Sequence, residues 1–210
     1  MTVLSQILEH KIVAIIRGAH PADVLKIARA LHEGGVRILE VTFNSPNALD
    51  VLEELSTKLG NELLIGMGTV LDAPTVKAAV DAGAKFIISP SFNIEIIQET
   101  KKLGAISIPG AFTPTEIVNA FSAGGDIIKV FPASSNVNYI KELRAPLSHI
   151  PLMPTGGITL ENIKEFQHAG AVAFGIGTAL VNTKEKVTDD YLKRLTEKAA
   201  HFAQAITNHQ

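Results

Sequence analysis

Three charged residues stand inside segments that are otherwise apolar, and they are the first candidates for chemistry. They are Arg17, Glu40 and Lys129. A charge in a strand that is covered on both faces is costly unless it is paired or used. All three fall in the later part of their segments, the end at which α/β barrels place their active sites. We therefore expect them to meet in one site.

Lys129 carries the sharpest signal, because the segment Ile-Ile-Lys-Val-Phe surrounds its amine with bulky apolar residues. Desolvation of that kind, aided by a nearby guanidinium such as that of Arg17, lowers the pKa of a lysine and yields a neutral amine. A neutral amine attacks ketones and forms a Schiff base. The alternative is a buried lysine that pairs with Glu40 for structure alone.

Glu40 is the candidate proton carrier beside that amine. A carboxylate near a Schiff-base lysine moves protons to and from substrate or water when an apolar wall raises its pKa. Thr42 lies two residues further on, hence on the same face of the strand. Phe131 and Phe112 are candidates for the pocket wall, although ordinary core packing explains an aromatic residue there equally well.

Metal and thiol chemistry are disfavoured. The chain has no cysteine, which excludes a thiolate nucleophile, an iron–sulfur cluster and zinc bound through sulfur. The histidines fall on expected helices or loops, without HxH or HExxH spacing, at His10, His20, His32, His149, His168, His201 and His209. We expect a reaction with no metal and no cofactor.

The elements that must position these residues alternate regularly. Short apolar runs, typical of parallel strands covered on both faces, occupy residues 12–18, 38–43, 63–70, 86–90, 105–111, 127–133, 151–158 and 172–180. Helical spacing of apolar residues lies between them, for example at residues 22–31, 48–59 and 115–122. Residues that favour helix starts stand at Ser45, Asp72 and Thr113.

Eight strand–helix units predict an α/β fold, a single-domain (β/α)₈ TIM barrel over residues 1–210. An extra N-terminal helix at residues 3–10 and a long final helix at 189–208 complete the chain. An open, doubly wound sheet is the structural alternative, because alternation alone does not prove that the sheet closes.

Two glycine-rich segments follow the expected seventh and eighth strands. The first is Thr155-Gly156-Gly157-Ile158 and the second is Gly175-Ile176-Gly177-Thr178. Paired glycines let backbone N–H groups approach an oxyanion, and a helix N-terminus adds a favourable dipole. Barrels commonly bind phosphate with these two loops. We expect phosphate binding here, which leaves the reaction open.

Composition narrows the class of partner. The formal net charge is −2, from 19 Lys and Arg against 21 Asp and Glu among 210 residues, which leaves no positive surplus for nucleic acid. Charged residues interrupt the apolar N-terminus, and no run is long enough to span a membrane. With no cysteine either, we expect a cytoplasmic protein that acts on small molecules.

Several segments together resemble the 2-keto-3-deoxy-6-phosphogluconate (KDPG) aldolases and their phosphogalactonate-specific relatives. They are ILEVT at residues 38–42, GMGTV at 66–70, ISP at 88–90, PGAFTPTE at 109–116, KVFP at 129–132 and PTGGI at 154–158. The resemblance implies that Lys129 forms a Schiff base with pyruvate and that Glu40 is the general acid–base. It implies a homotrimer without a metal.

The same resemblance implies roles for further residues. Thr69 and an arginine would hold the pyruvate carboxylate. The phosphate would lie against Gly156, Gly157, Gly177 and the hydroxyl of Thr178. We expect the pocket wall to consist of Thr42, Pro90, Phe131 and Thr155.

One departure concerns the arginine. Many members carry an arginine two residues after Glu-Val-Thr, where this chain has Asn44, and an amide does not replace a guanidinium fork. A branch of the family has an arginine in the first strand, so Arg17 would take the carboxylate. The phrase Asn-Ser-Pro that begins at Asn44 resembles the phosphogalactonate branch.

The expected reaction is reversible cleavage of KDPG to pyruvate and D-glyceraldehyde 3-phosphate. The 6-phosphogalactonate epimer and 4-hydroxy-2-oxoglutarate remain open as substrates. A phosphate-barrel isomerase or epimerase, or a phosphate-binding module, is the alternative of a different class.

Overall fold

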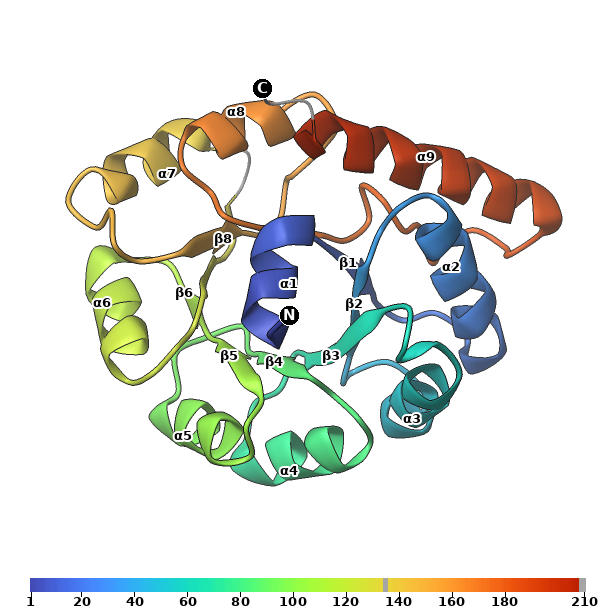
Figure 1. The fold of residues 1–210 in the computed structure, drawn as a ribbon, viewed down its shortest axis with the longest axis horizontal. Coiled ribbons are helices and arrows are strands. Elements are labelled where there is room, and N and C mark those ends of the chain that lie inside the picture. Colours follow the sequence, from blue (N-terminus) through green and yellow to red (C-terminus); the bar gives the residue numbers. More distant parts are fainter. Residues whose placement is uncertain (134–135, 208–210) are drawn as a thin grey trace.

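The computed structural model describes residues 1–133 and 136–207, in which helices and parallel strands alternate (Figure 1). The strands are β1 (Ile12–Ile16), β2 (Ile38–Thr42), β3 (Leu64–Gly68), β4 (Phe86–Ile88), β5 (Ile106–Ile108), β6 (Gly110–Ala111), β7 (Ile128–Val130), β8 (Leu152–Pro154) and β9 (Phe174–Ile176). The helices are α1 (Val3–His10), α2 (Pro21–Glu33), α3 (Ala48–Leu59), α4 (Ala73–Asp81), α5 (Ile94–Lys102), α6 (Pro114–Ser122), α7 (Val137–Arg144), α8 (Ile163–His168) and α9 (Asp189–Thr207).

The strands form a ring that the helices α2 to α9 surround (Figure 1). Six strands pair in the order β5-β4-β3-β2-β1-β9, and three more in the order β6-β7-β8. A parallel bridge from Thr155 to Gly175 joins β8 to β9. Since β5 and β6 are consecutive, the ring closes there as well. The predicted barrel is confirmed, and the open sheet is excluded.

The fifth predicted strand, residues 105–111, is divided into β5 and β6. Pro109 separates them, and proline has no N–H to donate to a ladder. β5 pairs with β4, whereas β6 pairs with β7. The division lets one run of chain serve both edges of the ring.

Side chains inside the barrel change from apolar to polar along its axis. At the N-terminal end the interior core contains Val13, Ile38, Leu64, Ile127 and Met153. Two residues further along each strand, the period of a strand face, the interior positions of β2 and β7 are occupied by Glu40 and Lys129. The residues between, such as Leu39 and Ile128, pack against the helices.

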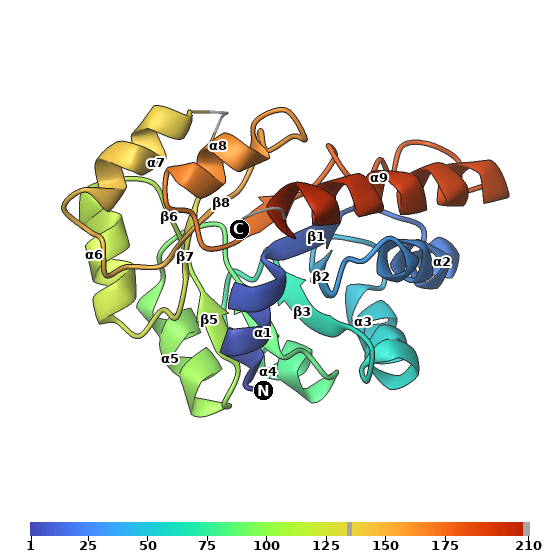
Figure 2. The same ribbon diagram turned by 45° about the horizontal axis from the view of Figure 1, so that its top comes forward.

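Helix α1 closes the N-terminal end of the barrel. It lies across the centre of the ring (Figure 1), and the turned view shows it between β5 and β3 (Figure 2). Its Ile7 is fully buried in the interior core. The predicted N-terminal helix at residues 3–10 is confirmed. With this end closed, the opposite end is left for a site.

Two of the three predicted helix starts are confirmed. Asp72 caps α4, and Thr113 caps α6 in a capping box with Glu116. Ser45 caps no helix, because α3 begins only after Asn47. The final helix, predicted to end at residue 208, is described to Thr207, and residue 208 lies outside the described residues. Among the described helices none combines the length and apolar character needed to cross a bilayer.

Candidate active site

A cavity of about 860 Å³ opens at the C-terminal ends of the strands. Ten of the thirteen candidate residues line it: Arg17, Thr69, Pro90, Lys129, Phe131, Thr155, Gly156, Gly157, Gly177 and Thr178. These residues come from six different strands or the loops that follow them. Glu40, Thr42 and Phe112 are not among the lining residues, and Phe112 stacks on Tyr139 instead.

Lys129 projects from β7 into the barrel and is only 3% exposed. Burial lowers the pKa of its amine, and the nearby Arg17 acts in the same direction, whereas Glu40 opposes them. The amine nitrogen lies 4.9 Å from the centre of the Phe131 ring. These surroundings favour the neutral, nucleophilic form of the amine at lower pH than for a lysine in water.

Glu40 lies deeper, in the middle of β2, and is 1% exposed. Neither carboxylate oxygen accepts a hydrogen bond from any described residue. Burial raises the pKa of the carboxyl, against the opposing effects of Lys129 and Arg17. A buried acceptor without a partner is costly, and a raised pKa suits a group that exchanges protons near neutrality.

The absence of a side chain at Gly68 leaves the space that Glu40 occupies. Gly68 was not among the site residues predicted from the sequence. A Cβ atom on Gly68 would lie 1.7 Å from the Glu40 Oε1 atom. On the same strand, a Cβ atom on Gly66 would lie 2.4 Å from the Phe86 ring. Glycines inside a strand often mark a close approach, so the spacing Gly-Met-Gly was the available signal.

Arg17 departs from the expectation that it is held inside an apolar wall. β1 ends at Ile16, and Arg17 is exposed at the rim of the cavity, followed by Gly18 with a φ of 68°. Its guanidinium donates a hydrogen bond to Asn44 Oδ1 at 3.2 Å. The N–H of Gly18 donates to Ser45 Oγ at 2.8 Å. The turn after β2 therefore holds the arginine.

Asn44 and Ser45 thus have roles that the sequence did not indicate. Ser45 anchors the backbone after Arg17 instead of starting a helix, and its Oγ also lies 2.9 Å from Thr42 Oγ1. This contact corrects the assignment of Thr42 to the pocket wall. Thr42 is fully buried and its hydroxyl is turned to Ser45 rather than to the cavity.

Thr69 has a φ of 60°, in the left-handed region. A β-branched residue is rarely found there, and the conformation costs roughly 1–3 kcal/mol. The strained residue lines the cavity. Strain of this kind is often stored where a side chain must be held in a particular place.

The two glycine-rich loops lie at the same cavity. Gly156 and Gly157 have φ values of 87° and 77°, which favour glycine. Asn162 fastens this loop, since its Nδ2 donates to the carbonyl of Gly157 at 2.8 Å and its Oδ1 accepts from the N–H of Thr159 at 2.9 Å. The backbone of Gly156 and Gly157 therefore lines the cavity, just before the segment that leads to α8.

Among the described residues, no three His, Asp or Glu side chains gather in a group that would hold a metal ion. His209 lies outside the described residues.

Comparison with known proteins agrees with the fold. The model of the KDPG and KHG aldolase family matches residues 3–197. A 2-dehydro-3-deoxy-6-phosphogalactonate aldolase of Escherichia coli is 33% identical over 196 residues, covering 92% of this chain and 93% of that protein. A 2-dehydro-3-deoxy-phosphogluconate aldolase of Haemophilus influenzae is 35% identical over 166 residues, 78% of each chain.

A solved structure is similar across nearly the whole chain. The KDPG aldolase of Legionella pneumophila, determined with pyruvate captured at low pH as a covalent carbinolamine intermediate, superposes with a TM-score of 0.85 at 28% identity, covering 95% of this chain and 97% of that one. With an α/β barrel, a buried lysine at its open end and a family match over most of its length, the chain belongs to the KDPG and KHG aldolase family.

Proposed function

We propose that this aldolase cleaves 2-dehydro-3-deoxy-6-phosphogluconate to pyruvate and D-glyceraldehyde 3-phosphate through a Schiff base on Lys129. The observation that carries the proposal is the buried Lys129 amine, which lines the cavity and has a pKa lowered by burial. An isomerase, an epimerase or a binding module has no need of such an amine.

We also propose that residues 1–210 act as one catalytic domain.

In the proposed mechanism the neutral amine of Lys129 adds to the C2 ketone. Loss of water from the carbinolamine gives a protonated imine. Glu40, directly or through water, then takes the proton of the C4 hydroxyl. The C3–C4 bond breaks and its electrons pass to the imine, which becomes an enamine. The aldehyde leaves, C3 is protonated, and hydrolysis returns pyruvate and the free amine.

The remaining residues orient the substrate in this scheme. Arg17 and Thr69 hold the carboxylate, which brings the C2 ketone to the amine and supplies a proximity effect. The loops of Gly156, Gly157 and Gly177 and the hydroxyl of Thr178 hold the phosphate. No metal or cofactor takes part.

The test is to trap the imine. The protein is treated with pyruvate and borohydride, and the modified residue is located by mass spectrometry. A reduced pyruvate adduct on Lys129, formed in the presence of a chelator, supports the proposal. An activity that is lost to the chelator while no adduct forms would overturn it.

The 6-phosphogalactonate epimer is the second candidate substrate. The chain shares the Asn-Ser-Pro phrase with that branch, and the 33% identical relative bears that name. Measurement of kcat/KM on both epimers and on 4-hydroxy-2-oxoglutarate decides among the three.

Replacing Asn44 with alanine is expected to raise the KM for pyruvate in the condensation direction about fivefold to tenfold, with little change in kcat. Asn44 holds the guanidinium proposed to bind the carboxylate, and a hydrogen bond to a charged group contributes roughly 1.5–3 kcal/mol before exposure reduces it. Steady-state kinetics measure the effect. Asn47→Gly is the control, because Asn47 lies in the same loop without that contact and glycine accepts its φ of 51°. Equal losses in both variants would contradict the assigned role.

Replacing Thr69 with glycine is expected to stabilise the fold and weaken the enzyme. Glycine adopts the φ of 60° without strain, and relief of about 1 kcal/mol raises Tm by roughly 2–4 °C in a protein of this size. The hydroxyl proposed to bind the carboxylate is lost, so KM for pyruvate rises. Calorimetry and kinetics check the two effects. A lower Tm for Thr69→Gly would contradict the prediction that its left-handed backbone is strained.

We propose a homotrimer, so light scattering is expected to give three times the 22.4 kDa of one chain. Support comes from large apolar side chains exposed around the open end of the barrel: Leu71, Phe92, Ile94, Phe112 and Val118. Leu71→Asp with Ile94→Asp should reduce the mass to that of a monomer. A monomeric parent protein would refute the trimer.

Since a phosphorylated substrate is retained inside cells, we also propose a cytoplasmic location.

A further inference from the structure

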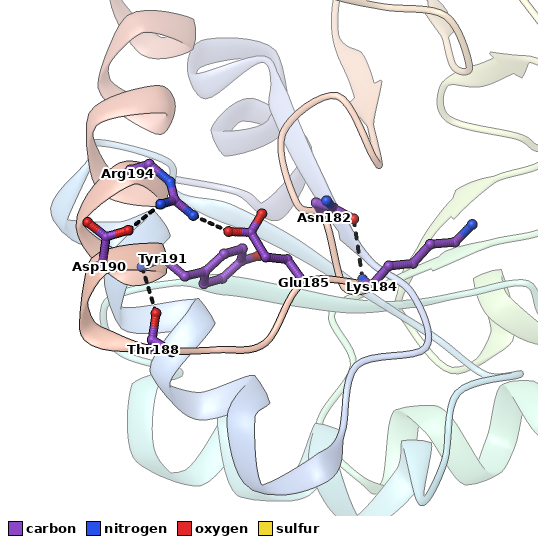
Figure 3. Close-up of polar contacts among 7 residues, drawn as sticks. All are labelled: Asn182, Lys184, Glu185, Thr188, Asp190, Tyr191 and Arg194. Carbon is purple, nitrogen blue, oxygen red and sulfur yellow. Dashed lines mark hydrogen bonds and ion pairs between the residues drawn. The ribbon is translucent and has the colours of Figure 1, made fainter.

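The loop between β9 and α9 carries a lysine that neither the mechanism nor the sequence motifs use. Lys184 lines the same cavity as Gly177 and Thr178, just beyond them in the chain. Figure 3 shows its side chain extending away from the group formed by Glu185, Asp190 and Arg194.

Hydrogen bonds hold this loop on both sides of Lys184. Thr183 Oγ1 donates to the carbonyl of Arg17 at 2.6 Å, which ties the loop to the rim residue proposed to bind the carboxylate. The N–H of Lys184 donates to Asn182 Oδ1 at 3.3 Å. The backbone at Lys184 is therefore held in place before any ligand arrives, which reduces the entropy that the loop loses on binding.

The neighbouring acid is already engaged. Glu185 accepts a hydrogen bond from Arg194, which also binds Asp190, and these contacts are visible in Figure 3. Within the described part of the chain, no carboxylate forms an ion pair with Lys184. The carboxylate next to Lys184 in the chain is thus paired with Arg194 rather than with the lysine.

The ionisable side chains among the described residues that line the cavity are all basic. Arg17 and Lys129 are assigned to the carboxylate and ketone end of the substrate, and no Asp or Glu lies among the described lining residues. Lys184 is the remaining cation, and it follows the glycine loop. A cation beside backbone donors strengthens binding of a doubly charged phosphate more than that of a neutral group.

We propose that Lys184 is a specificity residue that binds the phosphate of the substrate and makes the enzyme prefer phosphorylated over unphosphorylated 4-hydroxy-2-keto acids. The inference rests on the proposed function for the identity of the substrate. It extends that function, because it adds a charged side chain to a cradle otherwise made of backbone and one hydroxyl.

Kinetics on two substrates provide the first test, with Lys184→Gln, Lys184→Arg and the control Lys186→Gln. Lys186 lies in the same exposed loop but does not line the cavity. Lys184→Gln is expected to raise KM for the phosphorylated substrate about tenfold, leaving its kcat and the kcat/KM for 4-hydroxy-2-oxoglutarate unchanged. Lys184→Arg should restore most of the loss, and Lys186→Gln should match the parent.

Calorimetric titration with inorganic phosphate provides a second test that does not need turnover. The parent protein is expected to bind phosphate, and Lys184→Gln to bind it about tenfold more weakly, with a difference that shrinks as salt increases. Equal phosphate affinity in parent and Lys184→Gln overturns the proposal, as does no binding by the parent. A parent that binds phosphate through Lys184 but forms no pyruvate adduct refutes the proposed function alone.

Discussion

Replacing Lys129 with methionine is expected to lower aldolase activity by at least roughly 10⁴-fold, because no other group supplies the electron sink that the C3–C4 cleavage needs. The pyruvate adduct should disappear with it. Methionine fills similar space without a charge, so the fold is expected to remain. A coupled assay for pyruvate measures activity, and far-ultraviolet circular dichroism checks the fold.

Lys85→Met is the matched control for Lys129→Met. Lys85 is an exposed lysine just before β4, at the opposite end of the barrel from Lys129. It should keep its activity and its adduct. If Lys129→Met retained either property, the assignment of the nucleophile would be wrong.

Lys129→Met also tests the environment of the Lys129 amine, through its effect on the free energy of unfolding. Burial holds the pKa of Lys129 below its ordinary 10.5, so the folded state binds fewer protons than the unfolded state between those two values. The free energy of unfolding contributed by this group therefore rises as pH increases through that window. Lys129→Met should lack this rise and, because it leaves the buried Glu40 carboxyl without its positively charged neighbour, should be less stable than the parent at neutral pH. Denaturant unfolding at several pH values measures both.

The barrel could be predicted from local patterns, because strands buried on both faces leave a clear apolar signature. The runs that hold Glu40 and Lys129 were recognisable since a charge there has no ordinary explanation. The spacing of two residues along a strand also placed Glu40 and Thr42 on one face, and both are buried.

What the sequence could not provide was the outcome of contacts between distant segments. Arg17 looked like part of an apolar strand, but the chain turns outward at Gly18, and Ser45 from another loop fixes that turn. Ser45 carried the pattern of a helix cap, and the tertiary contact took precedence over it. Thr42 faces Ser45 for the same reason, which removes it from the cavity.

The role of Gly68 also depends on a contact between distant segments, and a glycine has no side chain whose chemistry could indicate that role. Its importance lies entirely in the Glu40 carboxylate that fills the space where a Cβ atom would be. Replacing Gly68 with alanine is expected to displace that carboxylate and lower kcat on the order of 10²- to 10⁴-fold, the range attributed to a general acid–base group. The pyruvate adduct on Lys129 should still form, since the amine is intact. Kinetics and borohydride trapping on one preparation separate the two effects.

Gly66→Ala is the matched control on the same strand. Its Cβ atom would meet the Phe86 ring at 2.4 Å and the Phe86 carbonyl oxygen at 2.5 Å, so overpacking should lower stability by roughly 1–3 kcal/mol. For Gly68 the atoms in the way belong to the Glu40 side chain, which can rotate. We therefore expect Gly68→Ala to reduce activity and Gly66→Ala to reduce the free energy of unfolding.

A double-mutant cycle shows whether Gly68 acts through Glu40. In a Glu40→Ala background the carboxylate is already absent, so Gly68→Ala should change kcat by less than about threefold, although it is severe in the parent. Two residues that acted independently would lose activity by the product of their separate factors. If Gly68→Ala were equally damaging in both backgrounds, the added methyl would be distorting β3 itself, and the glycine would belong to the fold rather than to the catalytic acid–base.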